Sequence, residues 1–525
     1  MQPRPWVPAV GLSPAEQTIV RRVRRAKLFV FLREQRHRIF DAPFQAELAQ
    51  MYADAPQGQP PISPVLLALA TILQAYCGVS DDEAVEACVM DRRWQLVLDC
   101  LDCADAPFST GTLVAFRERV IAGEMDRRLI DRTVVVAKET KGFGHAQLRL
   151  ALDSSALWGA GRVEDTVNLL GHALRKAVGV LARRPGREGA DGASVPAGAV
   201  SPVLDTTQSL KAALDVDWDD PAGRAWALGV VLGALEQVAA VVAAQPASPA
   251  QVAAQAAVAV AQQVAAQDVE AGPDGRPQLR RGVAKDRRIS VEDADMRHGR
   301  KSASLVVDGF KRHVGRDLDS GLVRAVGLTA ANAPEASVTP AIAADLAQQG
   351  DPLRELHIDR AYLSSHLVQE RRDDLTIFCK AWPVRNGNRF AKTAFTLDWA
   401  AGQLQCPAGV RMPFTAGRTV QFPALLCGSC LYRERCTTSS RGRSVHVHPD
   451  ERLLEELRER QQTAAGRAAL RERVQVEHTL AHIGHWQRDR ARYRGLRKNL
   501  FDLRRMAVVS NLHDLMRLPD VEQAA

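Results

Sequence analysis

The chain has 525 residues, of which 46 % are hydrophobic and 25 % charged, and this composition indicates a globular protein of roughly three or four domains. Its formal net charge of +8 permits a polyanionic partner but is spread too thinly over this length to identify one. The sequence contains no uncharged apolar run of about 18 residues, and its start, MQPRPWVPAVGL, lacks the regions of a signal peptide. We therefore expect a cytoplasmic protein that contacts no membrane.

The first part of the chain is helical by pattern. Residues 1–60 are expected to form a basic N-terminal arm with a helix, and they include the run RRVRRAK at 21–27. Residues 61–142 predict short helices, one stopped at Gly78 and the next capped by Ser80. Short helices separated by turns are typical of a helix-turn-helix DNA-binding domain, although a generic helical bundle gives the same pattern.

Within residues 143–162 the spacing of apolar residues changes from the helical pattern to an alternation of every second residue. Here LRLALDSSALWG alternates apolar and polar residues, which predicts a strand that ends on Asp153. Residues 163–290 then read as a helical insertion. It begins with an amphipathic helix at 163–182 and contains an alanine-rich tract at 222–270, which predicts two antiparallel helices.

Residues 291–384 predict the remainder of an α/β sheet. Two strand-like stretches across 304–331 are joined as a hairpin, and short strands at 355–359 and 375–380 alternate with helices. This order describes a mixed sheet with helices on its faces.

Two of the predicted strands end on a carboxylate, Asp153 and Asp359. Ligand sites of α/β sheets collect beyond the carboxyl ends of the strands. Two neighbouring carboxylates repel each other unless a cation lies between them, and Mg²⁺ prefers such oxygen ligands. Taken alone, either aspartate is better explained as a strand-end cap or a salt-bridge partner. Asp308 is a rival acid in the hairpin, where a turn or substrate contact is the better explanation.

Residues 449–525 predict a long helix from about 449 to 483, followed by a basic helical C-terminus. The helix carries Glu477, with Arg473 one turn earlier on the same face. In isolation this is an ordinary ion pair. Beside two strand-end aspartates, Glu477 becomes a candidate third ligand of a metal site.

Residues 385–448 contain a cysteine block. Its members follow the spacing C-x20-C-x2-C-x5-C and are Cys406, Cys427, Cys430 and Cys436. Four thiolates with one close pair suit tetrahedral Zn²⁺, so we predict a structural zinc site in preference to four unpaired thiols. The cysteines nearer the N-terminus are expected to pack in a helical core, because a cytosolic chain favours no disulfide framework.

Basic residues cluster around and after Glu477, where they are candidate contacts to DNA phosphates. These candidates are Arg473, Arg488, Arg490, Arg492, Arg494, Arg497 and Lys498. Three histidines, His478, His482 and His485, have a spacing that permits metal binding, but phosphate contact or local capping explains them better.

Taken in order, these features resemble the bacterial insertion-sequence transposases of the DDE type. The resemblance rests on LALDSSALWGAGRVEDT, VVDGFKRHVGRDLDSGLVRAVGLTAANAPEAS, LHIDRAYLSS and RVQVEHTLAHIGHWQRDRARYRGLRKNLFDLRRMAVVSNLHDL, and on the N-terminal PPISPVLLALATILQAYCGVSDDEAVE. It implies an RNase H-like α/β domain whose mixed sheet has helices on both faces. That domain would be interrupted by the helical insertion and the Cys-rich segment, and preceded by an all-helical N-terminal domain.

The resemblance also implies chemistry. Asp153, Asp359 and Glu477 would hold two Mg²⁺ (or Mn²⁺) ions about 3.5–4 Å apart. The enzyme would cut the ends of the element and transfer the freed 3′-hydroxyl to target DNA. Its partner would be double-stranded DNA, both terminal inverted repeats and target, bound by a homodimer at the bacterial nucleoid.

Two departures from the family pattern stand out. A long helical insertion separates Asp153 from Ser304, and Leu470 and Gly484 occupy positions where related transposases carry Tyr and Lys. We expect Arg488 or Arg490 to take over the basic role. The alternatives are a catalytically inactive, transposase-derived, zinc-containing DNA-binding protein and a helical scaffold built on the alanine-rich tract.

Overall fold

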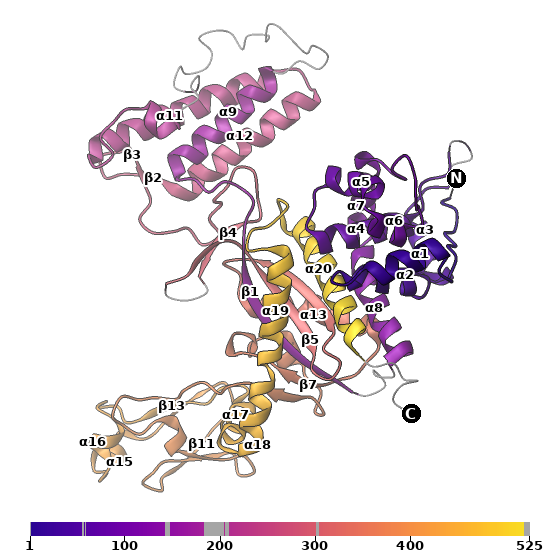
Figure 1. Ribbon diagram of the computed structural model, residues 1–525. Helices are drawn as coiled ribbons and strands as arrows, with labels where there is room; N and C mark the ends of the chain where they lie inside the picture. The colour runs from indigo at the N-terminus through magenta and orange to yellow at the C-terminus, as the bar shows by residue number, and fades with distance from the viewer. Residues whose placement is uncertain are drawn as a thin grey trace.

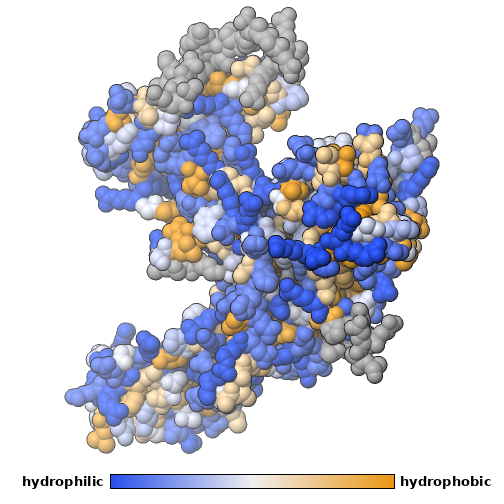
Figure 2. Space-filling model, viewed as in Figure 1, coloured by the Kyte–Doolittle hydropathy of each residue, from blue (hydrophilic) through white to orange (hydrophobic). Residues whose placement is uncertain are grey.

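The computed structural model describes residues 2–54, 57, 59–141, 147–182, 204, 209–300 and 304–518. A central sheet lies beside a group of N-terminal helices, and a helical bundle and a small β-rich lobe project from its opposite ends (Figure 1). Figure 2 shows the two projections separated by open space, with hydrophobic residues scattered over a mostly hydrophilic face. The expected domain boundary at 142/143 lies outside the described residues.

Helices fill the chain before the sheet. They are α1 (Pro14–Arg22), α2 (Lys27–Ile39), α3 (Ala42–Ala49), α4 (Pro64–Cys77), α5 (Asp81–Met90), α6 (Arg92–Leu98), α7 (Thr110–Ala122) and α8 (Met125–Lys141). Helix α4 ends at Gly78, whose φ of 71° suits glycine, and Ser80 caps α5 through a capping box with Glu83, as the sequence predicts. Because α4 is apolar and buried over most of its length, it forms the centre of this helical group.

The sheet is mixed and has six strands. Its main path runs β4 (Arg297–Arg300), β5 (Val306–Asp317), β1 (Leu148–Trp158), β7 (Leu353–His357) and β8 (Thr376–Phe378), and β6 (Val323–Ala330) also pairs with β5. Strand β1 is antiparallel to β5 and parallel to β7. The hairpin and both short strands are confirmed, whereas β4 was not predicted.

Helices cover both faces of the sheet. Successive residues of β1 point to opposite faces and therefore pack in two different cores. Leu150 and Leu152 pack in one core with α13 (Thr339–Gln349) and α17 (Glu451–Gln462). Ala151 packs in another core with α19 (Val474–Gln487) and α20 (Leu496–Arg517). The helix that carries Glu477 is therefore fixed against one face of the sheet.

The prediction of one long helix over 449–483 is wrong. The chain forms three helices there, α17, α18 (Ala464–Glu472) and α19. Thr463 has extended backbone angles and caps α18 by accepting a hydrogen bond from the Gly466 amide at 2.9 Å. The turn is so tight that a Cβ at Gly466 would lie 2.0 Å from the Arg460 carbonyl oxygen. The helical spacing of apolar residues continues through the turn at Thr463, so the sequence pattern alone predicts an unbroken helix.

The insertion between β1 and β4 is a helical bundle with its own core. It contains α9 (Thr166–Ala182), α10 (Leu210–Ala213), α11 (Pro221–Ala243), α12 (Pro249–Asp268), β2 (Val269–Ala271) and β3 (Pro277–Leu279). The two helices predicted in the alanine-rich tract are confirmed as α11 and α12. Among single helices of the described residues, only α11 is long and apolar enough to cross a membrane. In this structure it packs against α9 and α12.

The Cys-rich segment forms the β-rich lobe. Its elements are β9 (Thr396–Asp398), β10 (Gln403–Gln405), β11 (Arg411–Pro413), β12 (Thr419–Gln421), α15 (Ala424–Gly428), α16 (Arg433–Cys436) and β13 (Ser444–His446). A small core that includes Phe395, Leu404 and Phe422 holds the lobe together. The other short elements are η2 (Glu335–Val338), η3 (Arg360–Tyr362), α14 (His366–Gln369) and η4 (Lys392–Ala394).

Helix α20 joins the N-terminal helices to the sheet. Asn511, which is fully buried, accepts a hydrogen bond from the Val323 amide of β6 at 2.7 Å and donates to Thr133 of α8 at 2.9 Å. Asp126 of α8 is 1 % exposed and pairs with Arg497 at 2.8 Å and Arg504 at 3.2 Å. These buried polar contacts fix how the two parts of the chain meet.

Replacing Asp126 by Asn tests this junction. The substitution removes the carboxylate shared by Arg497 and the buried Arg504 and leaves Arg504 only its longer contact to Asp345 at 3.7 Å. We therefore expect the free energy of unfolding to fall by about 3 kcal/mol. Urea denaturation followed by tryptophan fluorescence measures the change. The control, Asp102→Asn, removes an exposed ion pair with Arg92 and should cost less than about 1 kcal/mol. Equal losses in the two variants would contradict a structural role for the junction.

Candidate active site

The three predicted acids surround one cavity. Asp153, Asp359 and Glu477 all line a hollow of about 620 Å³ on the sheet, together with Arg473. They come from β1, from the loop after β7 and from α19, so distant parts of the sequence meet here.

Asp153 does not end its strand, as the sequence suggested. Strand β1 continues to Trp158 because β5 pairs with it as far as Gly309. The pairing of β1 with β7, however, stops at Ala151 and His357. Asp153 therefore lies just beyond the end of β7, at the level of the sheet where Asp359 also emerges.

Asp359 caps the short helix η3. Its carboxylate accepts a hydrogen bond from the Ala361 amide at 2.8 Å. Burial raises the pKa of Asp359, and the negative charges of Glu335 and Asp153 raise it further. The same two factors, burial and nearby carboxylates, raise the pKa of Tyr362, which is fully buried. Burial and the neighbouring carboxylates thus both disfavour the ionised form of Asp359, while Arg473 favours it.

Arg473 bridges two of the acids. Its guanidinium donates to Asp153 Oδ2 at 2.5 Å and to Glu477 Oε1 at 2.7 Å. The predicted pair between Arg473 and Glu477 is confirmed, and the contact with Asp153 is new. Burial lowers the pKa of Arg473, but Asp153 and Glu477 outweigh it and the net shift is upward. Arg473 supplies the positive charge between these two carboxylates.

A divalent cation fits this site by the chemistry of its donors, since carboxylate oxygens are the ligands that Mg²⁺ and Mn²⁺ prefer. Within the described ranges, no three Asp, Glu, His or Cys side chains already converge as a metal-binding group. Because Arg473 lies between Asp153 and Glu477, the guanidinium must move before both can share an ion.

Sequence reasoning missed three charged residues that line the cavity, Glu335, Asp489 and Arg312. Arg312 of β5 is 4 % exposed and donates to Ser155 Oγ at 2.6 Å, to Gln487 Oε1 at 3.1 Å and to the Arg488 carbonyl at 3.1 Å. Arg312 of β5 and Glu335 of η2 both lie in the stretch VVDGFKRHVGRDLDSGLVRAVGLTAANAPEAS, but nothing in the sequence shows that they reach the cavity, because strand pairing and the packing of η2 place them there.

Gly484 leaves the space that Arg312 occupies. A Cβ at position 484 would lie 2.9 Å from an Arg312 guanidinium nitrogen. A cation from β5 therefore stands beside the position where related transposases carry Lys. Of the two arginines expected to take this role, Arg488 is exposed at the end of α19 and Arg490 donates to the Gly159 and Ala160 carbonyls.

Several of the remaining basic candidates make contacts within the chain. Arg492 donates to the Val79 carbonyl at 2.6 Å, and Arg494 pairs with Glu292 at 2.5 Å. Arg497 is held by Asp126 in the buried junction, whereas Lys498 is exposed.

The rival candidates lie elsewhere. Asp308 bonds to His298 at 2.5 Å and lines a neighbouring cavity with Trp158 and Arg490. His482 and His485 line a third cavity, formed with α20, and His478 is exposed.

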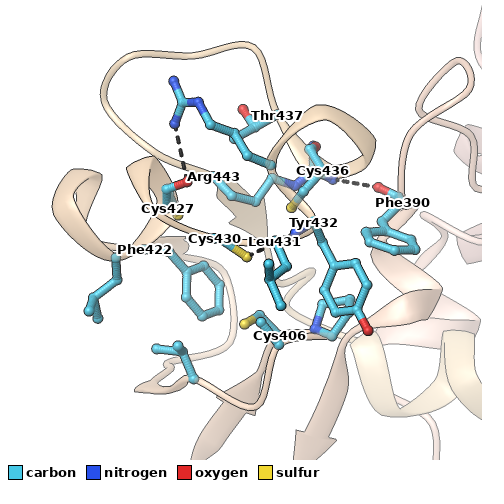
Figure 3. Close-up of a pocket in the computed structure, with 15 residues that line it drawn as sticks. Phe390, Cys406, Phe422, Cys427, Cys430, Leu431, Tyr432, Cys436, Thr437 and Arg443 are labelled. Atoms are coloured by element: carbon cyan, nitrogen blue, oxygen red, sulfur yellow. Dashed lines mark hydrogen bonds between the residues drawn. The ribbon is translucent and has the colours of Figure 1, made fainter.

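The four cysteines of the block line one cavity of about 270 Å³ in the β-rich lobe. Figure 3 shows Cys406, Cys427, Cys430 and Cys436 around the same space, beside Phe390, Phe422 and Tyr432. All four are free thiols. Burial raises the pKa of Cys436, as do its three cysteine neighbours, while Arg443 opposes the rise. Four soft sulfur donors in one partly apolar hollow fit Zn²⁺ by donor type.

Replacing Arg473 by Gln tests the charge balance of the acid cavity. The variant removes the ion-pair partner of Asp153, so we expect the unfolding midpoint to fall by about 2–4 °C in buffer without divalent cations. Addition of Mg²⁺ should reverse the loss, because it replaces the missing positive charge. Differential scanning calorimetry measures both effects.

The matched control for this variant is Arg372→Gln, which breaks an exposed pair with Asp374. It should leave the midpoint nearly unchanged. If Arg473→Gln and the wild type have the same unfolding midpoint in the absence of Mg²⁺, the acids do not depend on this guanidinium.

Comparison with known families adds two matches. Residues 405–516 match the family model described as Transposase DDE domain, and residues 21–119 match the model described as Transposase domain (DUF772). The first match includes Glu477 and the four cysteines, whereas Asp153 and Asp359 lie outside both. No curated protein and no solved structure matches the chain. Together the two family matches support the assignment of this chain to the insertion-sequence transposases of the DDE type.

Proposed function

We propose that the chain is an active DNA transposase, which cuts the ends of its element in a metal-dependent reaction and transfers the 3′-hydroxyl into target DNA. One observation carries the proposal: Asp153, Asp359 and Glu477, from three distant segments, line one cavity. The inactive, DNA-binding alternative is not favoured, because such a protein has no need of three acids in one hollow.

The sheet supports an RNase H-like catalytic domain. Its order β6-β5-β1-β7-β8 has β5 and β6 as an antiparallel hairpin beside β1, and β7 and β8 parallel to it. Asp153 is on the first of these strands in chain order, Asp359 follows the fourth, and Glu477 is on a helix after the fifth. This is the arrangement that the resemblance implies.

In this proposal the acidic residues would bind metal ions, and the arginines would contact phosphate or position the site. Asp153, Asp359 and Glu477 would hold two Mg²⁺ or Mn²⁺ ions, which when bound activate the attacking oxygen and stabilise the leaving oxygen at phosphorus. Arg473 would leave its carboxylate partners and turn to a DNA phosphate. Arg312 would keep a buried positive charge beside the cavity and orient the end of α19 through the Arg488 carbonyl.

Contacts to double-stranded DNA are proposed for the exposed Arg488 and Lys498, and for Arg490, Arg492 and Arg494 once DNA phosphates replace their contacts within the chain. Arg497 is the weakest of the predicted contacts because Asp126 holds it. The nucleic acid would be both the terminal inverted repeats and the target, and a homodimer would bind the two ends of the element. Such an enzyme would act on the bacterial chromosome in the cytoplasm.

A strand-transfer assay with DNA carrying the element's ends and Mg²⁺ tests the function. Asp153→Asn, Asp359→Asn and Glu477→Gln should each reduce cleavage and joining to background while DNA binding in gel shifts persists, because each removes a ligand charge. The matched control is Asp308→Asn, an acid of the same sheet in the neighbouring cavity, which should retain both steps. Full activity in the three acid variants would overturn the proposal.

We also propose that Cys406, Cys427, Cys430 and Cys436 bind one structural Zn²⁺ that fixes the β-rich lobe. The lobe's own core is small, so a metal would contribute much of its stability. Support comes from the four thiols around one cavity.

Elemental analysis of the purified chain tests the zinc site. We expect one zinc per chain, lost in Cys430→Ser but kept in Cys77→Ser, whose thiol lies in the N-terminal helices. Chelation should lower the melting temperature of the wild type and leave that of Cys430→Ser unchanged. Zinc retained at full stoichiometry in Cys430→Ser would rule out this ligand set.

A further inference from the structure

The β-rich lobe carries almost all of the excess positive charge of the chain. Residues 385–448 contain eight arginines and one lysine against two acids, Asp398 and Glu434, which gives a net charge of +7. The whole chain has 69 basic and 61 acidic side chains, so everything outside the lobe sums to only +1. Zinc held by four thiolates would add −2 and still leave the lobe at +5. The charge is therefore concentrated in one part of the molecule, which projects from the sheet (Figure 1).

The fold leaves most of this charge unpaired. Lys392 pairs with Glu451 of α17. In the part of the chain that the structure describes, none of the eight arginines of the lobe lies within 4.0 Å of a carboxylate oxygen. Six of them are exposed, namely Arg385, Arg389, Arg411, Arg418, Arg435 and Arg441. Positive charge that no acid of the chain neutralises is available to a partner.

Three arginine-bearing segments of the lobe meet at Phe390. The Phe390 amide donates to the Arg435 carbonyl at 2.7 Å, and the Arg435 guanidinium lies 4.9 Å from the centre of the Phe390 ring. Arg443 donates to the Phe390 carbonyl at 3.2 Å. Arg389 directly precedes Phe390, and Arg441 lies two residues before Arg443. The backbone segments that carry Arg389, Arg435 and Arg441 are therefore held side by side.

The partner that fits such a surface is a polyanion, and double-stranded DNA is the one that the observations favour. A duplex carries one negative charge for about every 1.7 Å of its axis, and the arginine guanidinium is well suited to phosphate. Leu425 and Leu431, on α15 and just before α16, are 88 % and 99 % exposed. Proteins that bind the minor groove insert apolar side chains of this kind between base steps, beside their arginines.

We propose that the β-rich lobe binds double-stranded DNA through its exposed arginines, by contacts to phosphates that do not depend on the base sequence. The inference rests on the proposed function, because it names a part of the chain that would hold the DNA on which the acids act. The residues that line the acid cavity all lie outside 385–448, so this surface is separate from the candidate active site. Its contribution to DNA binding can be measured without cleavage.

Binding of a labelled duplex of random sequence to the full chain tests the proposal. Fluorescence anisotropy is measured in buffer without Mg²⁺ at several salt concentrations. A variant with Arg389→Gln, Arg435→Gln and Arg441→Gln should bind about tenfold or more weakly. The slope of log affinity against log salt should fall by about 2–3, because each phosphate contact contributes about 0.9 to it.

The matched control removes the same charge from three exposed arginines outside the lobe. It carries Arg354→Gln and Arg372→Gln, which both contact Asp374, together with Arg467→Gln on α18. This variant should bind the duplex with the affinity and the salt slope of the wild type. An equal loss in the control and in the lobe variant would show that only the total charge of the chain matters, and would overturn the proposal.

Lysine at the same three lobe positions separates charge from structure. The variant with Arg389→Lys, Arg435→Lys and Arg441→Lys keeps the charge but changes the contact of Arg435 with Phe390, so it should retain most of the affinity and the salt slope. Wild-type binding by the glutamine variant, or equal losses in the lysine and glutamine variants, would contradict the inference. So would a glutamine variant that keeps its affinity for the duplex and loses affinity for single-stranded RNA.

Failure of this inference and failure of the proposed function give different results. If the glutamine variant binds the duplex as the wild type does while the wild type cuts and joins DNA, the lobe is not a DNA-binding surface and the transposase activity stands. If the glutamine variant loses duplex binding while the wild type shows no strand transfer, the DNA-binding lobe stands and the proposed activity does not.

Discussion

The crowding of carboxylates around one cavity is the constraint on which the rest of the structure depends. Five carboxylates line the same hollow, those of Asp153, Glu335, Asp359, Glu477 and Asp489. Like charges held close together need positive charge between them. Arg473 provides part of it by bridging Asp153 and Glu477. The surrounding fold holds the acids in place, and the proposed cations would supply the positive charge that Arg473 does not.

That fold holds each acid by a different means. Pairing with β5 keeps Asp153 in an extended strand, and the end of β7 releases Asp359 at the same level of the sheet. Glu477 is placed by α19, whose apolar side packs on the sheet. Helix α20 then ties this assembly to the N-terminal helices through Asn511 and the buried Asp126 cluster. The helical bundle and the β-rich lobe project outward from this centre (Figure 1).

Alternation of apolar residues predicted β1, the β5–β6 hairpin, β7 and β8, because that alternation is what the two faces of the folded sheet require. The three acids named from the sequence line one cavity, and their catalytic role stays a prediction. The sequence also predicted the pair of Arg473 with Glu477, since helical spacing alone decides that contact. It could not show that Asp153 lies mid-strand, that the helix before Glu477 is broken at Thr463, or that Arg473 reaches β1. Glu335 and Arg312 escaped notice for the same reason: their neighbours in the cavity are distant in sequence and meet only through strand pairing and helix packing.

Anomalous diffraction at the manganese edge, from the chain crystallised with element-end DNA and Mn²⁺, tests the central claim most directly. The account predicts manganese peaks in the acid cavity, liganded by Asp153, Asp359 and Glu477, with Arg473 no longer bonded to Asp153. A cavity without manganese, or one in which Arg473 still bridges Asp153 and Glu477 in the DNA complex, would contradict it.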